Sequence, residues 1–175
     1  METKRQMISL FAVCTPVCPD TVWESWYRFC MQQEQENAFS FTHVSCETET
    51  LKPTGIRTRS RYLKKIDACM AKKETMSSLE FYLLPKEFRQ AVFAFRVYMG
   101  LSLNLNYCEI TVENHFWKEF RYQEYLDRMK EFLKITKVEV NLLPYDQTFN
   151  YNVNCIAASN GAPEKYNVLQ RIYAE

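Results

Sequence analysis

Glycine is scarce in this sequence of 175 residues, which contains three glycines and six prolines. Glycine-rich phosphate loops and dinucleotide fingerprints need several residues that adopt positive φ, as glycine does most readily. Flexible linkers use the same residue types. The low glycine content therefore disfavours a nucleotide-binding fold and a chain divided by linkers, and we expect a single domain over residues 1–175.

Long apolar runs are also missing. No segment reaches the roughly 18 consecutive apolar residues that a membrane-spanning helix needs. The N-terminal segment METKRQMISLFAVCTPV has basic residues before an apolar run, but the run is short and no small-residue cleavage site follows it. We therefore expect a cytoplasmic protein with no membrane partner.

Histidine is nearly absent, since only His43 and His115 occur. Neither histidine lies at a metal-ligand spacing from paired carboxylates. His43 alternates with Phe39 and Phe41, which is typical of a core position in a strand. Because no nucleophile, base and oxyanion donor occur together, we predict a protein that is not an enzyme and has no cofactor.

Apolar residues are plentiful, at 47% of the chain, and their periodicity predicts the secondary structure. Strands are predicted at residues 7–13, 38–46, 78–84, 91–100, 101–112 and 137–146, and helices at 21–36, 56–73 and 116–135. A shift in the alternation near Cys108 predicts a β-bulge. This order of elements predicts an α+β fold in which a largely antiparallel sheet packs against two or three helices.

Seven cysteines are scattered along the chain, an odd number that favours reduced, buried thiols over a disulfide framework. Cys14 and Cys18 form the segment CTPVCP between a predicted strand and a predicted helix. A thiol at a helix start has a lowered pKa. The segment resembles the Cys-x3-Cys-Pro motif of Sco-type copper chaperones and thiol oxidoreductases, which implies copper binding or redox chemistry at these two thiols. The alternative, which we favour, is that both are packing residues.

Positive charge is concentrated in residues 52–73. Eight cations lie there against the single acid Asp67, a net charge of +7, so the rest of the chain carries −6 of the whole-chain +1. Such separation of charge steers an acidic partner or a nucleic acid to one face. The cations that we predict to contact a partner are Arg57, Arg59, Arg61, Lys64 and Lys65. Nucleic acid is the weaker alternative, because the only aromatic residue of the helix, Tyr62, lies in its apolar stripe.

Aromatic residues make up 15% of the sequence, and tyrosine and tryptophan are common contact residues of protein interfaces. Tyr122 and Tyr125 have charged neighbours, so we predict that they also contact a partner. In size, element order and composition over the whole chain, the sequence resembles the α+β immunity proteins of bacterial polymorphic toxin systems. That resemblance implies a bacterial protein that neutralises a cognate toxin domain by stoichiometric binding.

Overall fold

The computed structural model of the protein describes residues 6–51, 57–84, 95–101, 106–113, 122–144 and 167–173. In chain order they form β1 (Gln6–Pro16), α1 (Val22–Glu36), β2 (His43–Thr48), β3 (Arg57–Thr58), α2 (Arg59–Ala71), β4 (Met76–Leu83), β5 (Phe95–Gly100), β6 (Tyr107–Glu113), α4 (Tyr122–Met129), β7 (Leu133–Pro144) and β8 (Asn167–Tyr173). None of the helices described is long and apolar enough to span a membrane.

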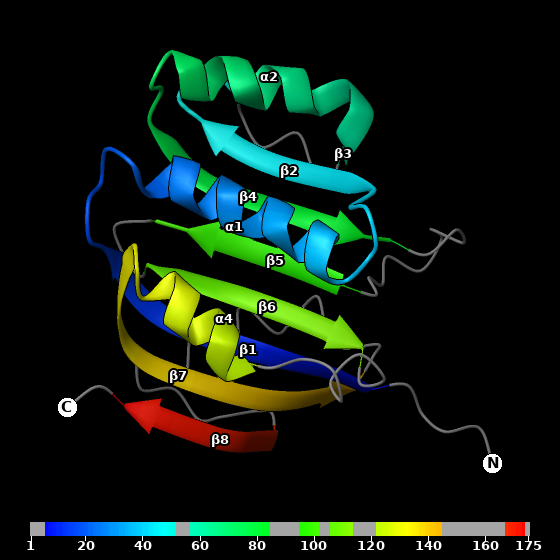
Figure 1. The fold of residues 1–175 in the computed structure, drawn as a ribbon, viewed down its shortest axis with the longest axis vertical. Helices are drawn as coiled ribbons and strands as arrows, with labels where there is room; N and C mark the ends of the chain where they lie inside the picture. Colours follow the sequence, from blue (N-terminus) through cyan, green and yellow to red (C-terminus); the bar gives the residue numbers. More distant parts are fainter. Residues whose placement is uncertain are drawn as a thin grey trace.

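The strands form one sheet in the order β3-β2-β4-β5-β6-β1-β7-β8, in which neighbouring strands are antiparallel. Figure 1 shows α1 and α4 in front of this sheet and α2 beside β2 at its upper end. The predicted α+β fold with an antiparallel sheet packed against helices is confirmed.

The side of the sheet that carries the helices is apolar, because alternate residues of each strand point to it. Its fully buried residues include Leu10, Leu79, Phe81, Cys108, Ile110 and Val112. Trp26 of α1 has no exposed surface and donates its indole N–H to the carbonyl oxygen of Leu79 at 3.1 Å. Cys108 lies 3.6 Å from the Met129 sulfur, so α4 covers the part of this side formed by β6.

Helix α1 begins and ends as predicted. Thr21 is its N-terminal flanking residue, although the Thr21 side chain makes no capping hydrogen bond, and the helix ends at Glu36. Val22, Trp26, Phe29 and Cys30 are all buried, which gives the helix the apolar stripe expected from their spacing.

The third predicted helix ends too late. Residues 116–121 lie outside the described residues, α4 ends at Met129, and the chain enters β7 at Leu133. Leu133 and Ile135 pair with Pro16 and Cys14 of β1. The prediction of helix up to Ile135 was therefore wrong, because long-range strand pairing outweighed the helical spacing of Leu133.

Two strand predictions also need correction. β2 begins at His43 and not at residue 38, and Phe41 is buried in the segment that precedes it. The predicted bulge near Cys108 is absent, because β6 keeps one register with β1 and with β5 from Tyr107 to Val112. Register shifts lie elsewhere, for example between Val13 and Cys14 opposite β7. Strand β8 was not predicted as a strand, and residues 91–94 and 102–105 lie outside the described residues.

Candidate protein-binding surface

The basic segment is a short strand followed by a helix. Arg57 and Thr58 are held extended by pairing with Val44 and His43 of β2, so α2 starts at Arg59 and not at residue 56. The helix ends at Ala71, two residues before Lys73, whose φ of 53° is left-handed. The predicted helix over residues 56–73 is therefore shortened at both ends.

The inner side of α2 is apolar and fixes which cations face outward. Tyr62, Ile66 and Cys69 are buried at 7%, 0% and 5% exposure. The exposed cations that flank them on the solvent-facing surface of α2 and at its C-cap, here called the basic stripe, are Arg61, Lys64, Lys65 and Lys72. At 3.6 residues per turn and 1.5 Å rise they fall within an arc of about 100° and along about 16 Å of helix axis. Four of the eight cations of the basic segment thus share one outward surface.

The ring of Tyr62 in α2 lies beneath Lys65 of the basic stripe. The Lys65 ammonium lies 5.6 Å from the centre of the Tyr62 ring, which is within cation–π distance. The ring itself is buried. Tyr62 therefore belongs to the core and offers no stacking surface beside the basic stripe, which agrees with its predicted place in the apolar stripe.

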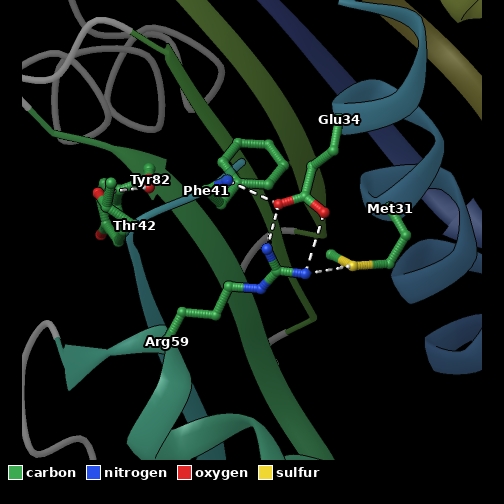
Figure 2. Close-up of polar contacts among 6 residues, drawn as sticks. All are labelled: Met31, Glu34, Phe41, Thr42, Arg59 and Tyr82. Atoms are coloured by element: carbon green, nitrogen blue, oxygen red, sulfur yellow. Dashed lines mark hydrogen bonds and ion pairs between the residues drawn. The ribbon is translucent and has the colours of Figure 1, made fainter. Parts of the chain in front are cut away.

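Arg59 does not belong to the basic stripe, although the sequence analysis placed it among the contact residues. Figure 2 shows its guanidinium between α2 and α1, where Nη1 contacts Glu34 Oε1 and Nη2 donates to Glu34 Oε2 at 3.0 Å. Nη2 also lies 3.3 Å from the Met31 sulfur. Glu34 Oε1 further accepts the Phe41 backbone N–H at 2.6 Å. Because its side chain is 22% exposed and paired in this way, Arg59 joins two helices and is not available as a contact residue.

The predicted tyrosine contacts are corrected in part. Tyr125 is 6% exposed and packs edge-on against Phe29, and its hydroxyl accepts a hydrogen bond from Asn37 Nδ2 at 3.3 Å. Burial raises the pKa of the Tyr125 hydroxyl. It lies one helical turn before the buried Met129, so its position on the inner side of α4 explains why it is not a surface residue. Tyr122 is the first residue of α4, and the side-chain prediction for it lies outside what the structure describes.

The two cysteines of CTPVCP occupy different environments. Both are free thiols, but Cys14 is buried at 1% exposure and Cys18 is exposed. A side-chain hydrogen bond with Cys14, together with burial, raises the pKa of Cys108, so the neighbour of Cys14 in the core is Cys108. The Thr21 side chain, followed by the Asp20 backbone amide, lowers the pKa of Cys18. Of the two thiols that the copper or thiol redox alternative requires, Cys14 therefore lies in the core and Cys18 is exposed to solvent.

Sequence reasoning missed a polar layer on the other side of the sheet. Across β6, β1 and β7, Glu109, Phe11 and Glu139 lie in one row of the strand register. All three are buried, with exposures of 1%, 0% and 1%. The alternation in YCEITV and KVEV places these glutamates opposite the apolar side, but alternation does not reveal that the opposite side is covered.

The two buried glutamates have partners within the sheet. Glu109 Oε1 accepts hydrogen bonds from Thr111 and, at 3.4 Å, from Ser9. Lys137 forms an ion pair with Glu139 at 2.7 Å. Across the parts of the chain that are described, no group of three or more His, Cys, Asp or Glu side chains could hold a metal ion. We interpret this layer as part of the sheet's own packing, because paired buried charges need such partners to be tolerated.

Two surface grooves are lined by residues of the described helices. One of about 440 Å³ lies between α1 and α4, and its charged residues are balanced, with Arg28 and Arg128 against Glu36 and Glu131. The other, of about 460 Å³, lies where α1 starts and α2 ends, with Trp23 among its lining residues. The second groove adjoins the end of the basic stripe.

Comparisons with protein-family models, with curated proteins and with solved structures gave no match to this chain. The function is therefore inferred from the surface geometry described above.

Proposed function

We propose that this chain is a non-enzymatic protein-binding module, an immunity protein that binds a cognate bacterial toxin domain stoichiometrically through the basic stripe of α2. The proposal rests on the arrangement of side chains on α2. The inner side of α2 is packed against the core, and its solvent-facing surface and C-cap present Arg61, Lys64, Lys65 and Lys72 together to solvent. A helix that is packed against the core and presents several cations is suited to an acidic protein surface.

The fixed position of α2 strengthens this proposal. Arg59 ties the first turn of the helix to Glu34 of α1, and its backbone N–H donates to the Thr42 carbonyl oxygen at 3.0 Å. Binding to a surface that is already ordered loses less conformational entropy than binding that must order it. The cations can therefore set the rate and the specificity of association.

An acidic protein fits this surface better than a nucleic acid does. Non-specific binding of single-stranded nucleic acid combines phosphate contacts with aromatic side chains on which bases stack. The ring nearest the basic stripe belongs to Tyr62, which is buried at 7% exposure. Within the part of the chain that the structure describes, the stripe thus supplies positive charge without an aromatic stacking surface on α2.

The test is affinity capture from the native lysate after nuclease treatment, in reducing buffer, with three forms of the protein. These are the wild type, a stripe variant carrying Lys64→Glu and Lys65→Glu, and a charge-matched variant carrying Lys130→Glu and Lys134→Glu. Lys130 and Lys134 are exposed cations outside α2. We expect one acidic protein to bind the wild type and the matched variant stoichiometrically, and to be lost from the stripe variant.

The partner identified in this way should be toxic when it is produced alone and harmless when it is co-produced with the wild type. Equal capture by all three forms would exclude the basic stripe as the contact surface. Nuclease-sensitive material alone would favour the nucleic-acid alternative. A harmless partner would refute the immunity assignment while leaving protein binding intact.

A further inference from the structure

The groove at the end of α2 has an apolar floor. Met76, the first residue of β4, is 4% exposed, while Trp23 of α1 and Met70 of α2 are half-buried and pack against the core. Thioether and indole groups adapt to a flexible alkyl chain. In Figure 1 the start of α1 and the end of α2 lie at the same side of the molecule, which is where this groove is formed.

The rim of the same groove is acidic. Asp20, Glu24 and Glu74 line it, and Lys73 is the single cation among the described residues of its lining. Hydrogen bonds from Thr50, Cys69 and Thr48 lower the pKa of Glu74, so its carboxylate is ionised at neutral pH. The described lining of the groove therefore carries three acids against one base, which is opposite in sign to the adjoining basic stripe.

A groove of this composition matches one kind of side chain. Lysine and arginine combine an apolar stem with a cationic head, and they place the stem on apolar surface while the head remains near polar groups. A cation over an indole gains a further cation–π attraction. A carboxylate or phosphate would face the acidic rim, and a purely apolar side chain would leave the rim acids without a counter-charge.

We propose that this groove receives a lysine or arginine side chain of the protein that binds the basic stripe. The stem lies on Trp23, Met70 and Met76, and the cationic head lies among Asp20, Glu24 and Glu74. The assignment of that side chain to a protein partner rests on the proposed function. The partner surface is then acidic opposite the stripe and basic opposite the groove, which fixes its orientation along α2 and excludes uniformly acidic competitors.

The groove can be tested without the partner. The probe is n-butylguanidinium, which has an alkyl stem and a cationic head, and the matched control is n-butylurea, which has the same shape without the charge. Binding is followed through the indole N–H resonance of Trp23 in an NMR titration, with the resonance assigned from a Trp23→Phe variant. We expect n-butylguanidinium to shift this resonance saturably and to leave that of the buried Trp26 in place.

Charge variants test the rim directly. Asp20→Asn and Glu24→Gln should each weaken n-butylguanidinium binding by about two- to five-fold, the range for an exposed ion pair. Glu131→Gln, which removes an acid from the other groove, should leave it unchanged. Equal binding of n-butylurea, or no saturable shift, or equal effects of Glu24→Gln and Glu131→Gln would overturn the inference.

A second measurement separates this inference from the proposed function. The partner captured through the basic stripe should bind the Glu24→Gln variant more weakly than the Glu131→Gln variant. If the stripe variant loses the partner but Glu24→Gln does not weaken its binding, the groove inference fails and the proposed function stands. If n-butylguanidinium binds as expected but no partner is captured, the groove binds cations and its assignment to a protein partner fails.

Discussion

The two sides of α2 carry side chains with different roles, although cations occur on both sides. On the inner side, Arg59, Ile66 and Cys69 contact the neighbouring core and helix, whereas on the outer side Arg61 and Lys64 face solvent. Arg59 and Arg61 are two residues apart and have the same side chain. Their difference shows that the position on a helix, and not the residue type, decides whether a cation stabilises the fold or remains available to a partner.

The largest expected difference is in thiol reactivity between the inner side of α2 and the exposed surface of the protein. Cys46 of β2 lies under α2, and burial raises its pKa to about 12, while burial also raises the pKa of Cys69. Cys18 is exposed and its pKa is lowered. Because only the thiolate reacts, alkylation at pH 8 should modify Cys18 at least about a hundred-fold faster than Cys46.

This prediction is measured by an iodoacetamide time course followed by peptide mass mapping, in a Cys155→Ser background. Thr21→Ala removes the hydroxyl that lowers the pKa of Cys18, so the pH at which Cys18 becomes reactive should rise. Equal alkylation rates for Cys18, Cys46 and Cys69 would show that the inner side of α2 is open to solvent.

The next largest effect is on stability. Ile66 has no exposed surface, so Ile66→Ala should lower the free energy of unfolding by about 2–5 kcal/mol, as expected for a large-to-small change in a core. Lys64→Ala, on the outer side of the same helix, should change it by less than about 0.5 kcal/mol. Urea denaturation measures both values. A loss below about 1 kcal/mol for Ile66→Ala would contradict the described packing of α2.

The smallest expected effect is the difference in the free energy of unfolding between substitutions of Arg59 and Arg61. Arg59→Ala leaves Glu34 without its guanidinium partner, and we expect a loss of about 1–3 kcal/mol in the free energy of unfolding. Arg61→Ala should be neutral within about 0.5 kcal/mol. A double-mutant cycle with Glu34→Ala isolates the pair energy of Arg59. If both arginines gave the same small loss, the distinction between the two sides of α2 would fail for charged residues.

Much of the fold could be predicted from local patterns. The burial of Val22, Trp26 and Phe29 follows directly from their helical spacing. Helical spacing also places Arg59 on the inner side of α2, because it lies three residues before Tyr62 and seven before Ile66, which are both buried. A basic residue in that position needs an acid nearby, but the sequence does not identify Glu34, 25 residues earlier, as that acid.

What could not be predicted depends on contacts between distant segments. Leu133 follows a helical spacing but pairs with Pro16, which no local pattern indicates. Alternation in the sequence is consistent with Glu109 and Glu139 on one side of the sheet, but it does not show that this side is buried. The acidic groove requires the start of α1 and the end of α2 to meet, so it is visible only in the folded chain.

The position of β1 has a consequence for the synthesis of this protein. β1 pairs with β6 and β7, so Met7 cannot form its strand pairings until Glu113 and Leu143 have been synthesised. At about 5–20 residues per second, the ribosome delivers the last of these partners roughly 7–27 s after Met7. During that interval the apolar residues Ile8, Leu10 and Phe11 lack their sheet neighbours. A nascent chain of this kind depends on β6 and β7 to complete the central strands, and truncation before β7 leaves β1 without one of its two neighbours.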